Sequence, residues 1–157
     1  METKQKFLSF HLGLEDQAVI TLDYIAEVLQ VSLSQICVVP QMPKCVLGIY
    51  SWRGEMLWLV DLEEKLGYPS VLQSSSLITK MMVIVIKHKG KHLGLMVRQL
   101  TDIEWLDPQE MKIPSQDLFY PAMTPFLQGY ITNGAEKMVF FLDAISIIKS
   151  PAWEHHN

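Results

Sequence analysis

The sequence predicts a mainly β protein composed of two small, similar subdomains. Its apolar residues occur in short runs separated by glycine, proline and polar turns, which is typical of strands. The second half of the chain repeats motifs of the first half in the same order. Hydrophobic residues make up 49% of the 157 residues and charged residues only 19%, so the chain can bury a substantial core. Two similar halves of short strands favour two small β-barrels packed together, because closing each barrel removes its exposed edges.

The chain is expected to begin with two short strands, at residues 6–12 and 18–21, joined by a turn. Residues 22–29 fit either a short helix with four apolar side chains facing inward or a return to strand at Val28, and both alternatives stay open. Residues 31–39 are expected to be extended, and residues 43–46 fit a single helical turn after a proline-marked loop.

The central feature of the sequence is a predicted hairpin. Two apolar runs, residues 46–50 and 56–60, flank a polar turn at residues 51–55. Gly54 can adopt the positive φ angle that such turns often require. Arg53 is the only cation between residues 46 and 62, and the turn is expected to hold it away from the barrel wall.

A short helix is expected directly after this hairpin. Asp61 can act as its N-cap, with Glu64 at the third helical position, and Gly67 is a natural helix end. Residues 68–79 are rich in serine and are expected to form a flexible connector between the subdomains.

The second half predicts further hairpins. Its expected strands are residues 81–87, 91–97, 100–106, 126–132 and 137–142. Gly90 and the dipeptide Asn133-Gly134 mark two of the turns.

Two further helix starts and one long loop complete the second half. Asp107 followed by Pro108 is a helix start with proline in the first helical position. Residues 111–125 contain three prolines and are expected to form a long loop. Asp143 is expected to cap a terminal helix at residues 144–149.

The internal repeat consists of three matched motifs. They are Ile25-x-Glu27-Val28 with Leu100-x-Asp102-Ile103, Val46-Leu47-Gly48-Ile49-Tyr50 with Leu127-Gln128-Gly129-Tyr130-Ile131, and residues 57–62 with residues 139–144. Both members of the last pair end in an acid that begins a helix. The repeat therefore supports two related subdomains.

No catalytic set is found in the sequence, and we expect neither an enzyme nor a cofactor. A glycine-rich phosphate loop, a nucleophile elbow and paired metal-ligand clusters are all missing. His88 and His92 flank one predicted turn and could share a metal, but without a third ligand we expect them to be solvated. Glu63 and Glu64 are adjacent, so on a helix they do not face each other as a carboxylate pair.

Charge and cysteine content also restrict the function. A formal net charge of −4 argues against a general nucleic-acid binder. Cys37 and Cys45 are the only cysteines and are expected to be small buried or half-buried apolar residues. The first residues lack the apolar core of a signal peptide, and no apolar run is long enough for a membrane span. We therefore expect a cytoplasmic protein with reduced thiols.

The central hairpin resembles the signature of CheW-like domains, V-x-G-x-x-N-L-R-G-x-x-L-P-V-x-D-L. The matching residues are Val46, Gly48, Arg53, Gly54, Leu57, Val60, Asp61 and Leu62. The family's V-x-E-I element appears earlier as Ile25-Ala26-Glu27-Val28. The resemblance extends from Lys6 to about Ile148, which leaves no room for a second domain.

The sequence departs from the family pattern at four positions. The usual Asn, Leu and Pro of the signature are Ser51, Trp52 and Trp58, and the usual V-D near the end of a second-half strand is Val97-Arg98. The Trp-Arg-Gly-Glu-x-x-Trp variant resembles CheW-like proteins of pilus-motility and phototaxis systems.

The resemblance implies both a fold and a function. The fold is one CheW-like domain, residues 1–157, of two five-stranded SH3-like β-barrels with short helices, one of them C-terminal. Subdomain one is expected at about 14–80 and subdomain two at about 81–145, with the terminal segments completing the barrels. The function is that of a non-catalytic adaptor, recruited to receptor arrays. It binds the regulatory domain of a CheA-type histidine kinase and the cytoplasmic tip of a methyl-accepting chemoreceptor. The alternative is a β-barrel that binds a small ligand.

The candidate partner-binding residues come from the signature and from the V-x-E-I element. They are Ile25, Glu27, Gly48, Ser51, Trp52, Arg53, Gly54 and Trp58. Arg53 is the main candidate, because a guanidinium can contact a partner's carboxylate or carbonyl groups in a bidentate manner. An internal ion pair with Glu27 or Glu55 is its structural alternative. One of the two tryptophans could be an exposed anchor for a partner, or both could be buried.

Overall fold

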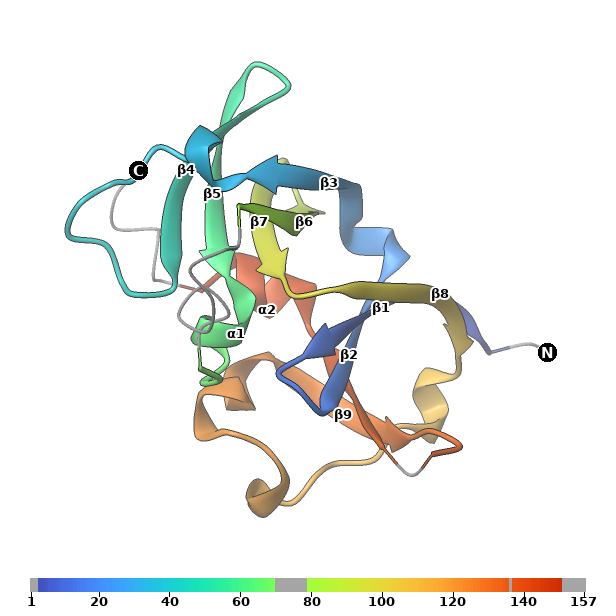
Figure 1. The fold of residues 1–157 in the computed structure, drawn as a ribbon. Helices are drawn as coiled ribbons and strands as arrows, with labels where there is room; N and C mark the ends of the chain where they lie inside the picture. The colour runs from blue at the N-terminus through green and yellow to red at the C-terminus, as the bar shows by residue number, and fades with distance from the viewer. Residues whose placement is uncertain (1–2, 70–78, 136, 151–157) are drawn as a thin grey trace.

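The computed structural model describes residues 3–69, 79–135 and 137–150, and the structural statements that follow concern these residues. They form two five-stranded sheets with two short α-helices (Figure 1). Sheet A has the order β8 (Leu100–Leu106), β1 (Gln5–Leu12), β2 (Asp16–Thr21), β10 (Met138–Leu142) and β9 (Leu127–Thr132). Sheet B has the order β3 (Ile25–Ser32), β6 (Lys80–His88), β7 (Lys91–Val97), β5 (Glu55–Asp61) and β4 (Val46–Trp52).

The two sheets share one topology, so the internal repeat is also a structural repeat. Each sheet contains one parallel pair, β2 with β10 and β5 with β7, and its other pairs are antiparallel. In sheet B, the segment after edge strand β3 forms a single bridge to the opposite edge strand β4, from Cys37 to Ile49. In sheet A, the segment after edge strand β8 forms the equivalent bridge to β9, from Lys112 to Tyr130. These bridges bring the two edges of each sheet together, as the predicted pair of small barrels requires.

The expected boundary near residue 80 does not coincide with the membership of the sheets. β1 and β2 pair with the late strands β8 and β10, whereas β6 and β7 pair with the early strands β3 and β5. Each sheet is therefore built from strands on both sides of the boundary between 14–80 and 81–145. Sequence order alone does not reveal this exchange, because the pairing partner of a hairpin is not encoded in its own apolar pattern.

The principal core lies between the two sheets. On β6, Ile84 and Ile86 face this core, while Val83 and Val85 face a smaller cluster inside sheet B. Successive residues of a strand point to opposite faces, so a strand that is buried on both faces needs an uninterrupted apolar run. The run 81–86 meets this need. Phe7 and Phe141 pack edge to face inside sheet A, with ring centroids 5.1 Å apart.

Both predicted α-helices form, and each begins at an aspartate N-cap. Asp61 caps α1 (Leu62–Lys65) by accepting a hydrogen bond from Glu64 N, and Gly67 follows with a φ angle of 93°. Asp143 caps α2 (Ala144–Ile148), which covers β6 and β7. Since α2 buries Ile147 and Ile148 in the principal core, tertiary packing stabilises this very short helix.

Several connecting segments differ from the sequence predictions. The ambiguous residues 22–29 divide into a 3-10 turn, η1 (Leu22–Tyr24), and the first half of β3. The segment expected to be extended at 31–39 is interrupted by η2 (Leu33–Gln35). The long proline-containing loop carries two 3-10 turns, η5 (Gln116–Leu118) and η6 (Pro121–Phe126). The helix start predicted at Asp107 and Pro108 forms as a short 3-10 turn, η4 (Pro108–Glu110), with Asp107 as its N-cap. Most of the expected connector 68–79 lies outside the described residues.

Candidate partner-binding site

The central hairpin ends in a tight two-residue turn at Arg53 and Gly54, with φ angles of 50° and 76°. Two positive φ angles define the type I′ turn, whose twist matches that of paired strands. The turn is shorter than the predicted 51–55, because Ser51 and Glu55 still belong to the strands. The neighbouring hairpin of β6 and β7 has the same turn at Lys89 and Gly90, with φ angles of 50° and 80°.

Arg53 is held in place by two side chains of sheet B. Its Nη2 donates a hydrogen bond to Glu27 Oε1 at 2.8 Å, and its guanidinium lies 4.6 Å from the centre of the Trp52 ring. Trp52 Nε1 donates to the same Glu27 oxygen at 3.0 Å. The Arg53 side chain is nevertheless 60% exposed. An ion pair this exposed contributes no more than about 1 kcal/mol to stability, so its main effect is to orient the guanidinium.

Trp52 and Trp58 differ in burial, and neither is a fully exposed surface residue. Trp52 is buried in the interior of sheet B beside Leu57 and Val83, and its ring centroid lies 4.9 Å from that of His92. Trp58 is half-buried and packs against the principal core. Opposite faces of sheet B therefore take one tryptophan each. The buried Trp52 ring thus packs against the guanidinium of Arg53.

Sequence reasoning missed Met56 as a surface residue of this hairpin. Met56 pairs with Ser51 next to the turn, and 79% of its surface is exposed. The sequence signal that could have indicated this exposure was the position of Met56 next to the predicted turn. In the structure Met56 belongs to none of the hydrophobic clusters that sheet B contacts. Ser51 is exposed beside it. Arg53, Ser51 and Met56 thus provide a cation, a hydroxyl and a flexible apolar side chain at one tip.

Gly48 and Ile25 have packing roles. A Cβ atom on Gly48 would lie 2.2 Å from the Cys37 carbonyl oxygen, so only glycine permits the bridge that joins Cys37 to Ile49. Gly129 meets the same requirement in sheet A, where a Cβ atom would lie 2.7 Å from the Lys112 carbonyl oxygen. Ile25 is half-buried against the principal core.

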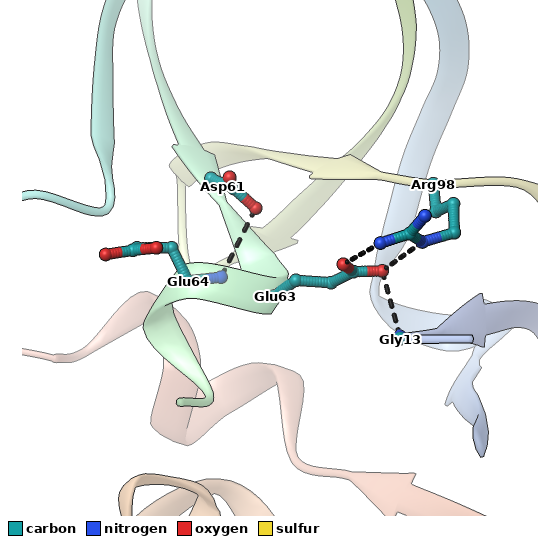
Figure 2. A network of polar contacts seen from close by, with 5 residues as sticks. All are labelled: Gly13, Asp61, Glu63, Glu64 and Arg98. Carbon is teal, nitrogen blue, oxygen red and sulfur yellow. Dashed lines mark hydrogen bonds and ion pairs between the residues drawn. The ribbon is translucent and has the colours of Figure 1, made fainter. Parts of the chain in front are cut away.

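A second polar network links the two sheets at the start of α1 (Figure 2). Arg98 donates from Nε to Glu63 Oε2 at 3.0 Å and from Nη2 to Glu63 Oε1 at 2.8 Å. The Gly13 N–H, in the β1–β2 turn of sheet A, donates to Glu63 Oε2 at 2.9 Å. The hydrogen bonds that Arg98 donates to Glu63 raise the pKa of Arg98 above its ordinary value. Arg98, which replaces an acid of the family pattern, therefore forms an intramolecular ion pair with Glu63.

The remaining candidate ligands are dispersed. His88 packs against Tyr24 with ring centroids 6.1 Å apart, and within residues 3–69, 79–135 and 137–150 no three His, Cys, Asp or Glu side chains gather as a metal site.

Cys37 is exposed, contrary to the prediction, because it lies on the segment that bridges the rim of sheet B. Cys45 is buried, and burial raises the pKa of its thiol. Among the helices described, none has the length and apolar character required to cross a membrane.

Two pseudo-symmetric five-stranded sheets, joined by a common core and displaying an arginine on one hairpin, define a double-barrel β domain. The chain belongs to the CheW-like domain family, whose model matches residues 6–152. Membership places the chain in a non-catalytic family, and the structural match reported below confirms the predicted fold.

Individual proteins give two further comparisons. The chemotaxis protein CheW of Helicobacter pylori (strain ATCC 700392 / 26695) is 27% identical over 97 residues, which cover 62% of this chain. This alignment spans only 54% of the H. pylori protein. The crystal structure of the scaffolding protein TtCheW from Thermoanaerobacter tengcongensis matches with a TM-score of 0.73 at 20% identity, covering 89% of each chain. At that identity the structural match shows the shared fold.

Proposed function

We propose that this chain is a cytoplasmic adaptor that couples a methyl-accepting chemoreceptor to a CheA-type histidine kinase. Family membership over residues 6–152 supports the adaptor class. The observation that carries the proposal is the oriented and exposed guanidinium of Arg53, which Glu27 and Trp52 hold at the hairpin tip. Arginine is enriched among the residues that dominate binding energy at protein interfaces, and a preoriented side chain loses less entropy on binding.

An adaptor of this kind acts by binding alone. If it binds the active and inactive arrangements of receptor and kinase with different affinities, it shifts their populations by that difference. No reacting group is needed on the adaptor itself. Arg53 would provide contact with the regulatory domain of the kinase, and Ser51 and Met56 would extend that contact along the hairpin.

A role in pilus motility or phototaxis is a finer proposal. Its support is the Trp52-Arg53-Gly54-Glu55 turn with Trp58 in place of the family's proline. In the structure this variant places a buried indole directly under the arginine. Identifying the receptor and kinase genes that neighbour this gene would separate such a pathway from chemotaxis proper.

The alternative of a barrel that holds a small ligand in its interior has less support. Trp52, Leu57, Leu59, Val83 and Val85 fill the interior of sheet B, and all are at most 6% exposed. Phe7, Val19, Val139 and Phe141 fill that of sheet A in the same way. Close-packed interiors leave no space for a ligand among these side chains.

The proposal is tested by measuring binding to the regulatory domain of a CheA-type kinase from the same genome. Arg53→Ala is expected to weaken binding about tenfold, which corresponds to about 1.4 kcal/mol. Arg53→Lys keeps the charge but loses the planar fork, so its affinity should lie in between. Lys89→Ala is the matched control, since Lys89 occupies the same position of an identical turn on the next hairpin.

Two results would contradict the proposal. One is wild-type affinity of a folded Arg53→Ala variant for both the kinase domain and a receptor tip. The other is an equal loss of affinity in Lys89→Ala, because a general effect of surface charge would then explain both variants.

A further inference from the structure

A surface cavity lies where the two sheets meet, beside the Glu63–Arg98 network. Its volume is about 400 Å³, and its walls include Leu14, Glu15 and Asp16 from the β1–β2 hairpin. Tyr68, Arg98 and Tyr120 complete those walls. It shares no residue with the Arg53 hairpin, so the following inference does not rest on the proposed function.

Two tyrosines give the cavity a fixed aromatic wall. The rings of Tyr68 and Tyr120 pack edge to face with centroids 4.6 Å apart. Tyr68 Oη donates a hydrogen bond to Asp16 Oδ2 at 2.5 Å, which fixes the position of that carboxylate. Burial, with a further contribution from Asp16, raises the pKa of the Tyr68 hydroxyl well above its ordinary value. Tyr68 therefore remains a donor at any physiological pH.

The charge of the cavity is negative although Arg98 lines it. Both carboxylate oxygens of the buried Glu63 bind Arg98, so the positive charge of Arg98 is already compensated. Glu15 and Asp16 have no ion-pair partner among the described residues. An adjoining hollow of about 320 Å³ shares Asp16, Tyr68 and Tyr120 and adds Asp117, while Lys137 lies with Glu15 and Asp16 at a third hollow.

We infer that this cavity binds a guanidinium group between the Asp16 and Glu15 carboxylates and the Tyr68–Tyr120 wall. A guanidinium is planar, pairs with carboxylates through two parallel hydrogen bonds and stacks on aromatic rings, so it matches both kinds of wall. A phosphate or carboxylate ligand would instead be repelled by the Glu15 and Asp16 carboxylates. The group can belong to a small free molecule or to an arginine side chain of another protein.

The test uses the full chain labelled with ¹⁵N and three probes. Agmatine supplies a free guanidinium, the peptide acetyl-Gly-Arg-Gly-amide supplies an arginine side chain, and the same peptide with citrulline replaces the cationic guanidinium by a neutral urea group of similar shape. We expect saturable shifts of the amide signals of Leu14, Glu15, Asp16 and Tyr120 with a guanidinium probe and none with the citrulline peptide. Binding of agmatine would show that a small molecule suffices, and binding of the arginine peptide alone would identify a protein ligand.

Variants locate the binding to the cavity. Glu15→Gln is expected to weaken guanidinium binding about tenfold and, since Glu15 is exposed, to leave the fold intact. Tyr120→Leu should weaken it as well by removing half of the aromatic wall. Glu110→Gln, at an exposed acid of η4 outside the cavity, is the control for net charge. No saturable shift with either guanidinium probe, equal shifts with citrulline, or wild-type affinity in Glu15→Gln would overturn the inference. None of these outcomes bears on kinase binding at Arg53.

Discussion

The Glu63 carboxylate, whose side chain is only 2% exposed, binds the Arg98 guanidinium through two hydrogen bonds of 2.8 and 3.0 Å. The same carboxylate accepts the Gly13 N–H from the other sheet. One acidic side chain of α1 thereby connects the end of β7 to the β1–β2 turn, as Figure 2 shows. The two sheets are thus joined by a polar contact as well as by the apolar core.

Arg98→Ala is expected to destabilise the protein by about 3 kcal/mol, because it leaves the buried Glu63 carboxylate without its cation. Urea unfolding followed by circular dichroism measures this difference. Arg53→Ala is the comparison, since it removes an exposed ion pair and should cost no more than about 1 kcal/mol. Equal destabilisation by the two substitutions would show that the Glu63–Arg98 pair contributes no more to stability than the exposed Glu27–Arg53 pair.

Gly48→Ala is expected to destabilise the protein by roughly 2–3 kcal/mol. Its φ angle is 142°, and the added methyl group would overlap the Cys37 carbonyl oxygen, so the bridge between Cys37 and Ile49 must open. Gly134→Ala is the matched control, because a Cβ atom there has no neighbour within 4 Å. Thermal unfolding compares the two. A Gly48→Ala variant as stable as Gly134→Ala would contradict the bridge as the reason for this glycine.

The two cysteines are expected to differ in reactivity. Cys37 is exposed, whereas Cys45 is 9% exposed and has a thiol pKa raised by burial. Since the thiolate is the reactive form, iodoacetamide at neutral pH should modify Cys37 first and Cys45 much more slowly. Mass spectrometry of timed digests identifies the order. Faster labelling of Cys45 would mean that the segment around it opens readily in solution.

Asp107 is expected to titrate below its ordinary range. The Thr3 hydroxyl donates to its Oδ2 at 2.6 Å and the Gln109 N–H donates to its Oδ1 at 2.9 Å, and these bonds lower its pKa. Because the folded pKa lies below the unfolded value, the stabilising contribution is complete above the unfolded pKa of about 3.9 and is lost as the pH falls through the folded pKa. NMR titration of the carboxyl carbon measures the value. Thr3→Val should raise it, and an unchanged pKa in that variant would remove Thr3 as the main cause.

Local sequence patterns predicted most strands and both α-helices because their signals are local. Asp61 and Asp143 act as N-caps as expected, and Gly54 adopts its positive φ angle in the central turn. The segments that differ are those whose geometry depends on distant partners. Residues 33–35 form a 3-10 turn, and two residues further on Cys37 bridges to Ile49 across the rim of sheet B.

The candidate site was only partly accessible from sequence. Glu27 and Arg53 were named as candidates and as a possible internal pair, and in the structure they form that pair while Arg53 stays exposed. The sequence analysis left the burial of Trp52 open and missed the exposure of Met56. Both follow from which face of sheet B each residue occupies, and a turn two residues long rather than five fixes that register.

The sequence alone determined the fold class, the repeat, the caps and the family resemblance, because these depend on residue type and spacing along the chain. The tertiary structure decided which strands share a sheet, and it joined Glu63, Arg98 and Gly13 from three separate segments. Such contacts depend on which hairpin pairs with which distant strand. Local periodicity specifies which face of a strand is apolar but not the strand that lies beside it.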